Sequence, residues 1–189
     1  MNTLVRSLTV SAAAAALALT TLSAPAFAEK PKWAKKSDAS IVEFAVASSG
    51  EPFDLDANGE DFDILVAALI ATGVVGIFDG TDYTVFAPND QAFYDLTGTD
   101  NDTDAFNAVV GLLDVEGVAE VLAYHVTDGV RNSRSVVSAN QIFMLDGNSI
   151  SFDSGMSLII ANQSAAGLLN IDNRLADGML HVIDTVLLP

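Results

Sequence analysis

The spacing of the apolar residues changes near residue 125, and this change limits the folds that the chain can adopt. Before that point, apolar residues recur every three or four positions, as on the buried face of an amphipathic helix. After it, short apolar runs alternate with turn signals built from Gly, Asn and Asp, as in a series of strands. Helices followed by strands are typical of an α+β fold with a mainly antiparallel sheet. We therefore predict this class, with the helices mostly in the N-terminal half.

Five helical segments are predicted before residue 126. The clearest is 62–70, because five apolar residues fall on one helical face there: Phe62, Leu65, Val66, Leu69 and Ile70. Asp61 stands at its N-cap position, and Gly73 is placed to end it. The other four segments are 41–46, 89–96, 104–114 and 116–125. Asn89 or Asp90 is positioned to cap the helix at 89–96.

The predicted strands lie mostly in the second half of the chain. One strand is expected at 83–88, where Pro88 removes a main-chain donor and ends it. Six further runs are predicted as strands: 126–129, 135–148, 149–155, 157–163, 166–173 and 178–188. Their spacing is that of a sandwich or barrel.

Residues 1–28 have the pattern of a signal peptide rather than of a folded segment. A short positively charged start is followed by a small apolar run and an Ala-Phe-Ala cleavage signature. No second apolar run of about 20 residues follows, so we expect no membrane insertion. We predict an exported protein, secreted to the extracellular space or periplasmic, cut near Ala28-Glu29. Residues 29–38 are expected to form a basic flexible tether, and residues 39–189 a single domain.

The chain is strongly acidic, and its charge excludes some partners. It carries 25 Asp and Glu residues against 8 Lys and Arg, a net charge of −17. Such a surface repels nucleic acid and anionic lipid. Two interpretations of the charge stay open: solubility in a saline habitat, or binding of cations.

An acidic stretch that begins at residue 54 resembles the front of a calcium loop. Oxygen-bearing side chains occupy its first, third and fifth positions: Asp54, Asp56 and Asn58. Gly59 follows at the sixth position, as in an EF-hand. The twelfth position, however, is Leu65 instead of a bidentate Glu, and Phe62 belongs to the helical stripe. We therefore predict a loop that leads into a helix, with a weak calcium contact as a candidate only.

The sequence offers no recognisable catalytic constellation. It has no Cys, no Gly-x-Ser-x-Gly and no His-Glu-x-x-His. His125 and His181 both alternate with apolar residues, which favours buried structural histidines over catalytic or metal-binding ones. We predict that the protein is not an enzyme and that it uses no cofactor.

Three segments together resemble the signature boxes of fasciclin-type (FAS1) domains. The first is YTVFAPNDQAF at 83–93, a strand followed by Ala-Pro-x-Asp-x-Ala-Phe. The second is the Tyr124-His125 pair that ends an apolar helix. The third is ADGMLHVIDTVLLP at 176–189. The resemblance covers residues 39–189.

The resemblance implies a wedge-shaped β-sandwich of mainly antiparallel strands with small helices packed on it. The matching residues are expected to be mainly structural, and they are Thr84, Phe86, Ala87, Pro88, Asp90, Ala92, Phe93, Tyr124, His125, Gly178, His181, Val182, Ile183, Asp184 and Pro189. Asp90 is expected to cap the turn that follows it, so that Phe93 folds back onto the core. Gly178 is expected in a tight turn, because Gly accepts positive φ angles at little cost.

The resemblance also implies a non-catalytic cell-adhesion module that contacts the matrix or the cell envelope. Its partner would be a protein or polysaccharide of the cell surface or matrix. In animal members an Asp-Ile dipeptide before the last box has been proposed to contact integrins. The matching positions here are Asp172 and Asn173, so Asp172 is a candidate interaction residue, but integrin-type recognition is not carried over. The alternative is a small-ligand or weak calcium-binding extracellular protein.

Overall fold

The structure is a computed structural model that describes residues 36–50, 55–77, 81–155 and 158–189. The predicted signal peptide, its cleavage point and residues 29–35 of the predicted tether lie outside the described residues. Within the described part, no helix combines the length and apolar character needed to cross a membrane.

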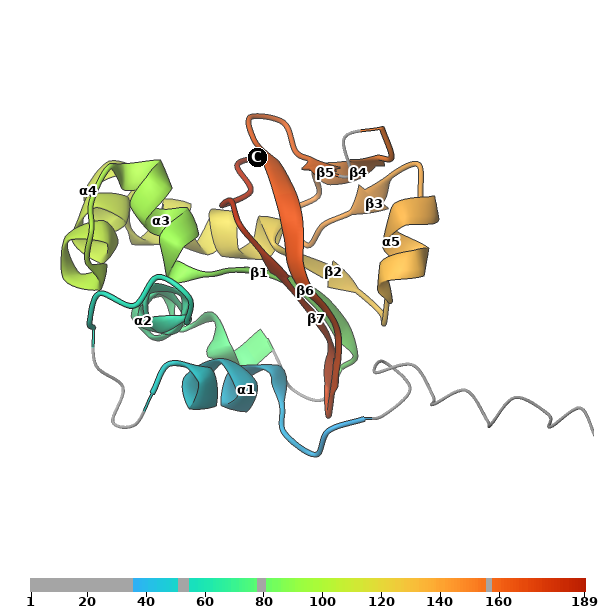
Figure 1. The fold of residues 1–189 in the computed structure, drawn as a ribbon, viewed down its shortest axis with the longest axis horizontal. Helices are drawn as coiled ribbons and strands as arrows, with labels where there is room; N and C mark the ends of the chain where they lie inside the picture. Colours follow the sequence, from blue (N-terminus) through green and yellow to red (C-terminus); the bar gives the residue numbers. More distant parts are fainter. Residues whose placement is uncertain (1–35, 51–54, 78–80, 156–157) are drawn as a thin grey trace, which may run out of the picture.

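Among the described residues, four α-helices gather on one side of the strands, and a fifth lies on the opposite side (Figure 1). The helical elements are α1 (Ile41–Ser48), α2 (Asp63–Thr72), the 3₁₀ turn η2 (Val74–Ile77), α3 (Asp90–Thr97), α4 (Asp102–Tyr124) and α5 (Ser133–Ser138). Asp114 interrupts α4, since its φ of 54° and ψ of −179° are not helical. The predicted helices at 104–114 and 116–125 are therefore the two halves of α4.

Seven strands form one hydrogen-bonded sheet in the order β2-β1-β7-β6-β5-β4-β3. They are β1 (Tyr83–Pro88), β2 (Val126–Asp128), β3 (Ile142–Phe143), β4 (Ser149–Asp153), β5 (Leu158–Ile160), β6 (Ala165–Leu175) and β7 (Gly178–Ile183). Only the β1–β7 pair is parallel among these ladders, and the other five are antiparallel. The predicted α+β class with a mainly antiparallel sheet is confirmed.

The central strands bury both of their faces, which is why β7 is apolar along its whole length. On β1, Val85 and Ala87 face a first core shared with α1 to α4, while Phe86 faces a second core. The second core lies between the central strands and β3 to β5. Register shifts in β6 interrupt its pairing with β7 between Leu168 and Asn173. Such bulges bend a strand, so one connected sheet encloses the second core as a sandwich wedge.

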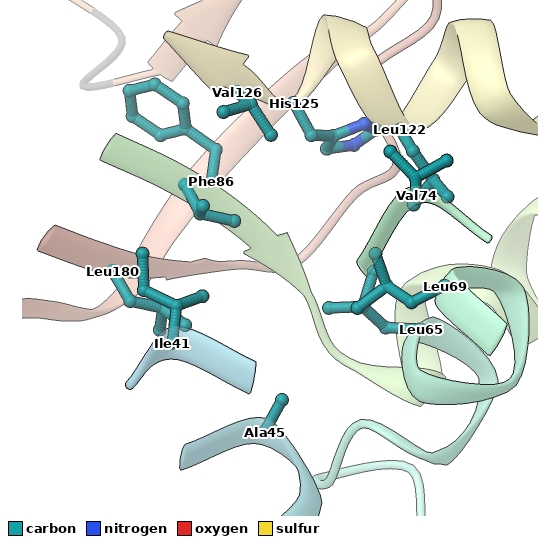
Figure 2. Close-up of a pocket in the computed structure, with 11 residues that line it drawn as sticks. Ile41, Ala45, Leu65, Leu69, Val74, Phe86, Leu122, His125, Val126 and Leu180 are labelled. Carbon is teal, nitrogen blue, oxygen red and sulfur yellow. The ribbon is translucent and has the colours of Figure 1, made fainter. Parts of the chain in front are cut away.

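The first core holds a small apolar cavity (Figure 2). Its lining comes from α1, α2, β1, β7 and the end of α4, and includes Ile41, Leu65 and His125. The volume is about 30 Å³, which is about the share of one water molecule in the liquid. This cavity is therefore too small for an organic ligand.

The predicted strand at 135–148 is wrong in its first part. Residues Ser133–Ser138 form helix α5, and the side chain of Asn132 accepts a hydrogen bond from the main-chain nitrogen of Ser135. An Asn cap at this position outweighs the strand preference of the Val pair that follows. Only the two residues of β3 are extended in the middle of this segment.

The stripe predicted for 62–70 is correct for most residues and wrong at its end. Ile70 is 64% exposed, whereas Ile64 and Ala68 are buried. Asp61 is not the N-cap either, because α2 begins at Asp63 after Phe62. The buried face is thus rotated toward Ile64, which packs in the first core.

Gly178 is required for a different reason from the one predicted. It is the first residue of β7, and it is not among the glycines with positive φ. A Cβ at this position would clash with the main-chain oxygen of Tyr83 on the parallel neighbour β1, and would lie 2.9 Å from Cδ1 of Ile41. The strand pair and α1 approach each other too closely here for any side chain.

We predict that Gly178→Ala lowers the free energy of unfolding by about 3 kcal/mol, because the added methyl group forces β1 and β7 apart. Denaturant unfolding of the mature chain measures this change. Gly111→Ala is the matched control, because that glycine is helical and has open space around its Cα. The control should gain about 0.5 to 1 kcal/mol. Equal effects of the two substitutions would contradict the steric account.

Candidate functional site: a cluster of buried carboxylates

The acidic loop before α2 is fastened to two other helices by its main chain. The carbonyl oxygen of Asp61 accepts from the nitrogen of Asp90 at 3.1 Å, and that of Gly59 accepts from Gln91 at 2.8 Å. The carbonyl oxygen of Asp56 accepts from the nitrogen of Asp102 at 3.1 Å. The first N–H groups of a helix have no partner within it. The loop thus supplies acceptors to the N-terminal ends of α3 and α4.

The side chain of Asp90 caps α2, not the helix that it begins. Its Oδ2 accepts from the nitrogen of Asp63 at 2.8 Å, and its Oδ1 accepts from the nitrogen of Ile64 at 3.0 Å. Helix α3 is capped instead by Asn89, whose Oδ1 accepts from the nitrogen of Ala92. The expected cap at Asp90 is therefore corrected: the carboxylate ties the end of β1 to the start of α2. The same contact replaces the cap predicted at Asp61.

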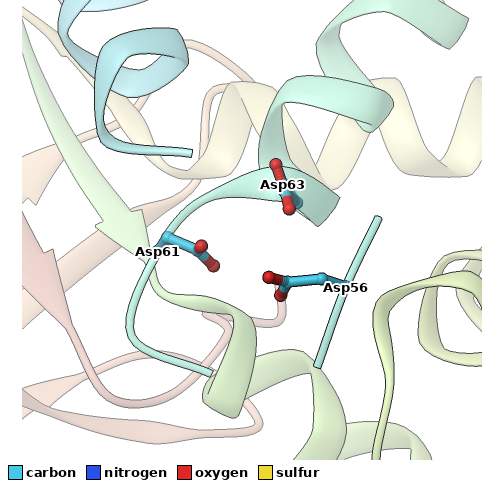
Figure 3. Close-up of side chains that lie close together, drawn as sticks. All are labelled: Asp56, Asp61 and Asp63. Carbon is cyan, nitrogen blue, oxygen red and sulfur yellow. The ribbon is translucent and has the colours of Figure 1, made fainter. Parts of the chain in front are cut away.

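These contacts bring five carboxylates together. Oxygens of Asp56, Asp61 and Asp63 lie within 4.8 Å of one another (Figure 3), and so do oxygens of Asp63, Asp90 and Asp102. Asp56 is exposed, whereas the other four are buried. Burial and, to a smaller extent, the neighbouring carboxyl of Asp61 raise the pKa of Asp90 to about 9.

Two oxygens of this cluster have no hydrogen-bond partner among the described residues. They are Oδ1 of Asp61 and Oδ2 of Asp102, and both are inaccessible to solvent. The other oxygen of Asp102 accepts a hydrogen bond of 2.5 Å from the hydroxyl of Tyr94. Burial raises the pKa of Asp102, as do the charges of Asp61 and Asp56, although the Tyr94 hydroxyl acts in the opposite direction. Buried oxygens without partners are unusual, and each needs a physical explanation.

The weak calcium contact predicted for Asp54, Asp56 and Asn58 stays a prediction. Asp54 lies outside the described residues. The side-chain oxygens of Asp56 and Asn58 accept from main-chain nitrogens two residues further on, at 2.6 and 3.3 Å. The Asn58 amide nitrogen donates to Asp61 Oδ2 at 2.8 Å. Oxygens of Asp56 converge with those of the downstream Asp61 and Asp63.

Both histidines lie in the interior and are held by main-chain groups. The nitrogen of Leu187 donates to Nε2 of His125, so Nδ1 carries the proton and donates to the carbonyl of Val121. In His181 the arrangement is reversed: Nδ1 accepts from Asp172, and Nε2 donates to the carbonyl of Arg131. Burial lowers the pKa of His125 to about 4, and it also lowers the pKa of His181. Each ring is therefore neutral, and both of its nitrogens are hydrogen-bonded to main-chain groups.

Asp172, the candidate interaction residue, is bonded within the chain. Its Oδ1 accepts from the nitrogen of Ser133 at 2.6 Å, and its Oδ2 accepts from the Ser133 hydroxyl at 2.7 Å. Its φ of 64° lies in the left-handed region, which Asp tolerates better than most residues. Asp172 therefore links β6 to α5, and its role in recognition stays a prediction.

The remaining motif residues also make internal contacts. The Thr84 hydroxyl donates to the carbonyl of Gly129, the Tyr124 hydroxyl donates to the carbonyl of Ser149, and Asp184 accepts from the nitrogen of Gly167. The apolar members of the boxes lie in the two cores: Phe86, Ala87, Ala92, Phe93, Val182 and Ile183. Pro88 pairs with Ile183 at the end of the sheet, and the carbonyl of Pro189 accepts from Gln163.

The fold and this arrangement define a small α+β domain whose motif residues connect its helices to its sheet. The family model of the fasciclin domain matches residues 60–189. The chain belongs to the fasciclin domain family.

Two relatives and one solved structure are similar to this chain. The chain is 28% identical to transforming growth factor-beta-induced protein ig-h3 of Sus scrofa over 74% of its own length, but it spans only 19% of that protein. It is also 28% identical to protein sll1483 of Synechocystis sp. over 82% of each chain. A FAS1 domain pair from the insect cell adhesion molecule fasciclin I matches with a TM-score of 0.57 and 16% identity, over 80% of this chain and 51% of that one.

We predict that His125 makes the protein sensitive to acid between pH 6.5 and 4. Unfolded histidine binds a proton below about 6.5, whereas the folded form stays neutral down to about pH 4. The unfolded state therefore holds more protons in this window, and stability falls as the pH falls. The loss attributable to His125 at pH 4 is about 3 kcal/mol.

The measurement compares the free energy of unfolding of the wild type and His125→Gln from pH 7 to pH 4. Every other titrating group, including His181, is common to both proteins, so the difference in slope isolates His125. Parallel curves would show that this imidazole is not buried as a neutral group.

We predict that Asp172→Ala lowers the free energy of unfolding by about 2 kcal/mol, because Ala tolerates the positive φ poorly and leaves Ser133 without its acceptors. Asp172→Asn should cost about half as much, since Asn accepts the left-handed region and retains one acceptor. Chemical denaturation of the two variants measures both values. Unchanged stability of the Ala variant would indicate that Asp172 has no structural role.

Proposed function

We propose that this protein is an exported, non-catalytic interaction module of the cell surface, matrix or envelope. The observation that carries the proposal is that both imidazoles of the boxes are occupied by main-chain partners. A general base needs a free nitrogen within reach of its substrate. With these groups bonded inside the fold, the outer surface is the part that remains for recognition.

Family membership supports the same proposal. The insect relative is a cell adhesion molecule by its description, and fasciclin domains typically occur in secreted or extracellular proteins. The predicted signal peptide agrees with export. A binding domain also needs no preorganised reactive group, which fits the chemistry of the described residues.

The surface indicates the chemistry of the partner. The net charge of −17 favours encounter with a basic protein, or with a polysaccharide that carries amino groups. Exposed apolar residues mark where close contact would form. On β6, Leu169 is 55% exposed and Ile171 is 39% exposed, and they lie three residues and one residue before Asp172. We place the contact face on this strand.

We predict that the mature chain, immobilised on a surface, retains whole cells, matrix protein or envelope polysaccharide. Retention should weaken when the salt concentration rises from about 50 mM to about 500 mM, because screening removes the attraction between exposed charges. Surface plasmon resonance with each of the three classes measures the association. Failure with all three classes would contradict an adhesion role.

Two variants test whether the contact face lies on β6. Leu169→Ser combined with Ile171→Ser should reduce retention, with the free energy of unfolding within about 0.5 kcal/mol of the wild type. Leu112→Ser on α4 is the matched control, because Leu112 is 76% exposed and lies away from β6. Equal losses in both proteins would exclude β6 as the contact face.

A further inference from the structure

The carboxylate cluster beside α2 poses an electrostatic problem. Four of its aspartates are buried, and Asp63 has oxygens within 4.8 Å of those of Asp61 in one triad and of those of Asp90 and Asp102 in the other. Like charges at such distances repel strongly in a medium of low dielectric constant. The one ion pair recorded among the described residues joins Arg174 to Asp82, which precedes β1, whereas Asp90 follows it.

Two independent observations point to a ligand at this cluster. Within each of the two triads, which share Asp63, the oxygens lie within 4.8 Å of one another. Separately, Oδ1 of Asp61 and Oδ2 of Asp102 are buried and have no hydrogen-bond partner among the described residues. Asp61 is 7% exposed and Asp102 is 0% exposed. A cation would satisfy an oxygen that has lost its water and gained no donor.

We propose that these two triads bind a divalent cation of the calcium class at Asp63, the residue that they share, with Asp61 contributed by one triad and Asp102 by the other. Asp56 forms the solvent-facing side of the site, since it is exposed and shares the first triad (Figure 3). Asp90 belongs to the second triad, but both of its oxygens already accept from the N–H groups that begin α2. The site goes beyond the adhesion role and does not depend on it.

The chemistry of the candidate ligands favours a hard cation. All the candidate ligands are carboxylate oxygens, which suit Ca²⁺ or Mg²⁺ better than zinc or copper. Two oxygens on opposite sides of Ca²⁺ are separated by about 4.6 to 5.2 Å, and the spacing of up to 4.8 Å within each triad matches this range. Mg²⁺ would require ligands within about 4.2 Å in octahedral geometry.

The consequence for the fold is that the cation joins two helices and a loop. Asp61 belongs to the loop, Asp63 to α2 and Asp102 to α4. The main chain of the loop already caps α3 and α4. A cation at the cluster therefore fastens the loop to its two helices and secures the start of α2.

Calorimetric titration of CaCl₂ into the mature chain, previously stripped with a chelator, tests the proposal. We expect saturable binding with a dissociation constant of about 0.1 to 1 mM, as in extracellular modules. Saturating Ca²⁺ should raise the unfolding midpoint by about 5 to 10 °C, and Mg²⁺ at the same concentration should raise it by less. No heat and no shift at 10 mM Ca²⁺, roughly ten times the upper value, would overturn the proposal, and the buried charges would then be neutralised by protons.

Two Asp→Asn variants locate the ion. Asp102→Asn should weaken binding by about tenfold or more. Asp104→Asn is the matched control, because Asp104 is exposed in the same first turn of α4. Asp61→Asn provides a second test in case the first variant fails to fold. Equal heats in the wild type and all three variants would indicate diffuse counter-ion binding and would overturn the site.

Tb³⁺, which substitutes for Ca²⁺ and emits when a nearby tyrosine is excited, reports the position independently. The hydroxyl of Tyr94 donates to Asp102, so the wild type should show sensitised emission that CaCl₂ displaces. Tyr94→Phe should bind Tb³⁺ but lose most of this emission. Undiminished emission from Tyr94→Phe would place the ion elsewhere.

Discussion

The parallel pairing of β1 with β7 is the interaction on which the rest of the structure depends. It joins the first and last family boxes in register from Tyr83 with Gly178 to Pro88 with Ile183. Both faces of this pair are buried, one against the helices and the other against the folded-over strands β3 to β5. The close approach at Gly178 and the Asp90 carboxylate at the other end fix how α1 and α2 meet the sheet.

The polar residues of the boxes form hydrogen bonds that hold other segments of the chain against this central strand pair. Buried polar groups are costly unless they are hydrogen-bonded, and a satisfied network specifies one arrangement of the core. His125 links α4 to the C-terminal segment through Leu187, and His181 links β7 to the segment before α5 through Arg131. Asp172 completes the second link, because it bonds to both His181 and Ser133. Chemistry-bearing residues are thereby used for architecture, and the acidic cluster stands out because two of its oxygens are not satisfied.

The sequence was sufficient to predict the fold class and most elements, because hydrophobic spacing is a local signal. It failed where a distant contact decides the outcome. The cap of α2 comes from Asp90, and no local pattern around Asp61 indicates a partner that far along the chain. The helix at 133–138 was not predicted, because the strand preference of the Val pair conceals the helix-capping preference of Asn132. The carboxylate cluster was also missed, since its members come from three segments that only the fold brings together. The signal that could have found it is the recurrence of Asp just before apolar helical stripes.

The central claim is that the box residues hold the fold together and take no part in chemistry at the surface. The most direct test is the ¹⁵N chemical shifts of the two imidazoles in the mature chain at pH 7. The account predicts two neutral rings of opposite tautomer, with the proton on Nδ1 in His125 and on Nε2 in His181. Charged rings, or two rings with averaged shifts typical of solvent exchange, would contradict it.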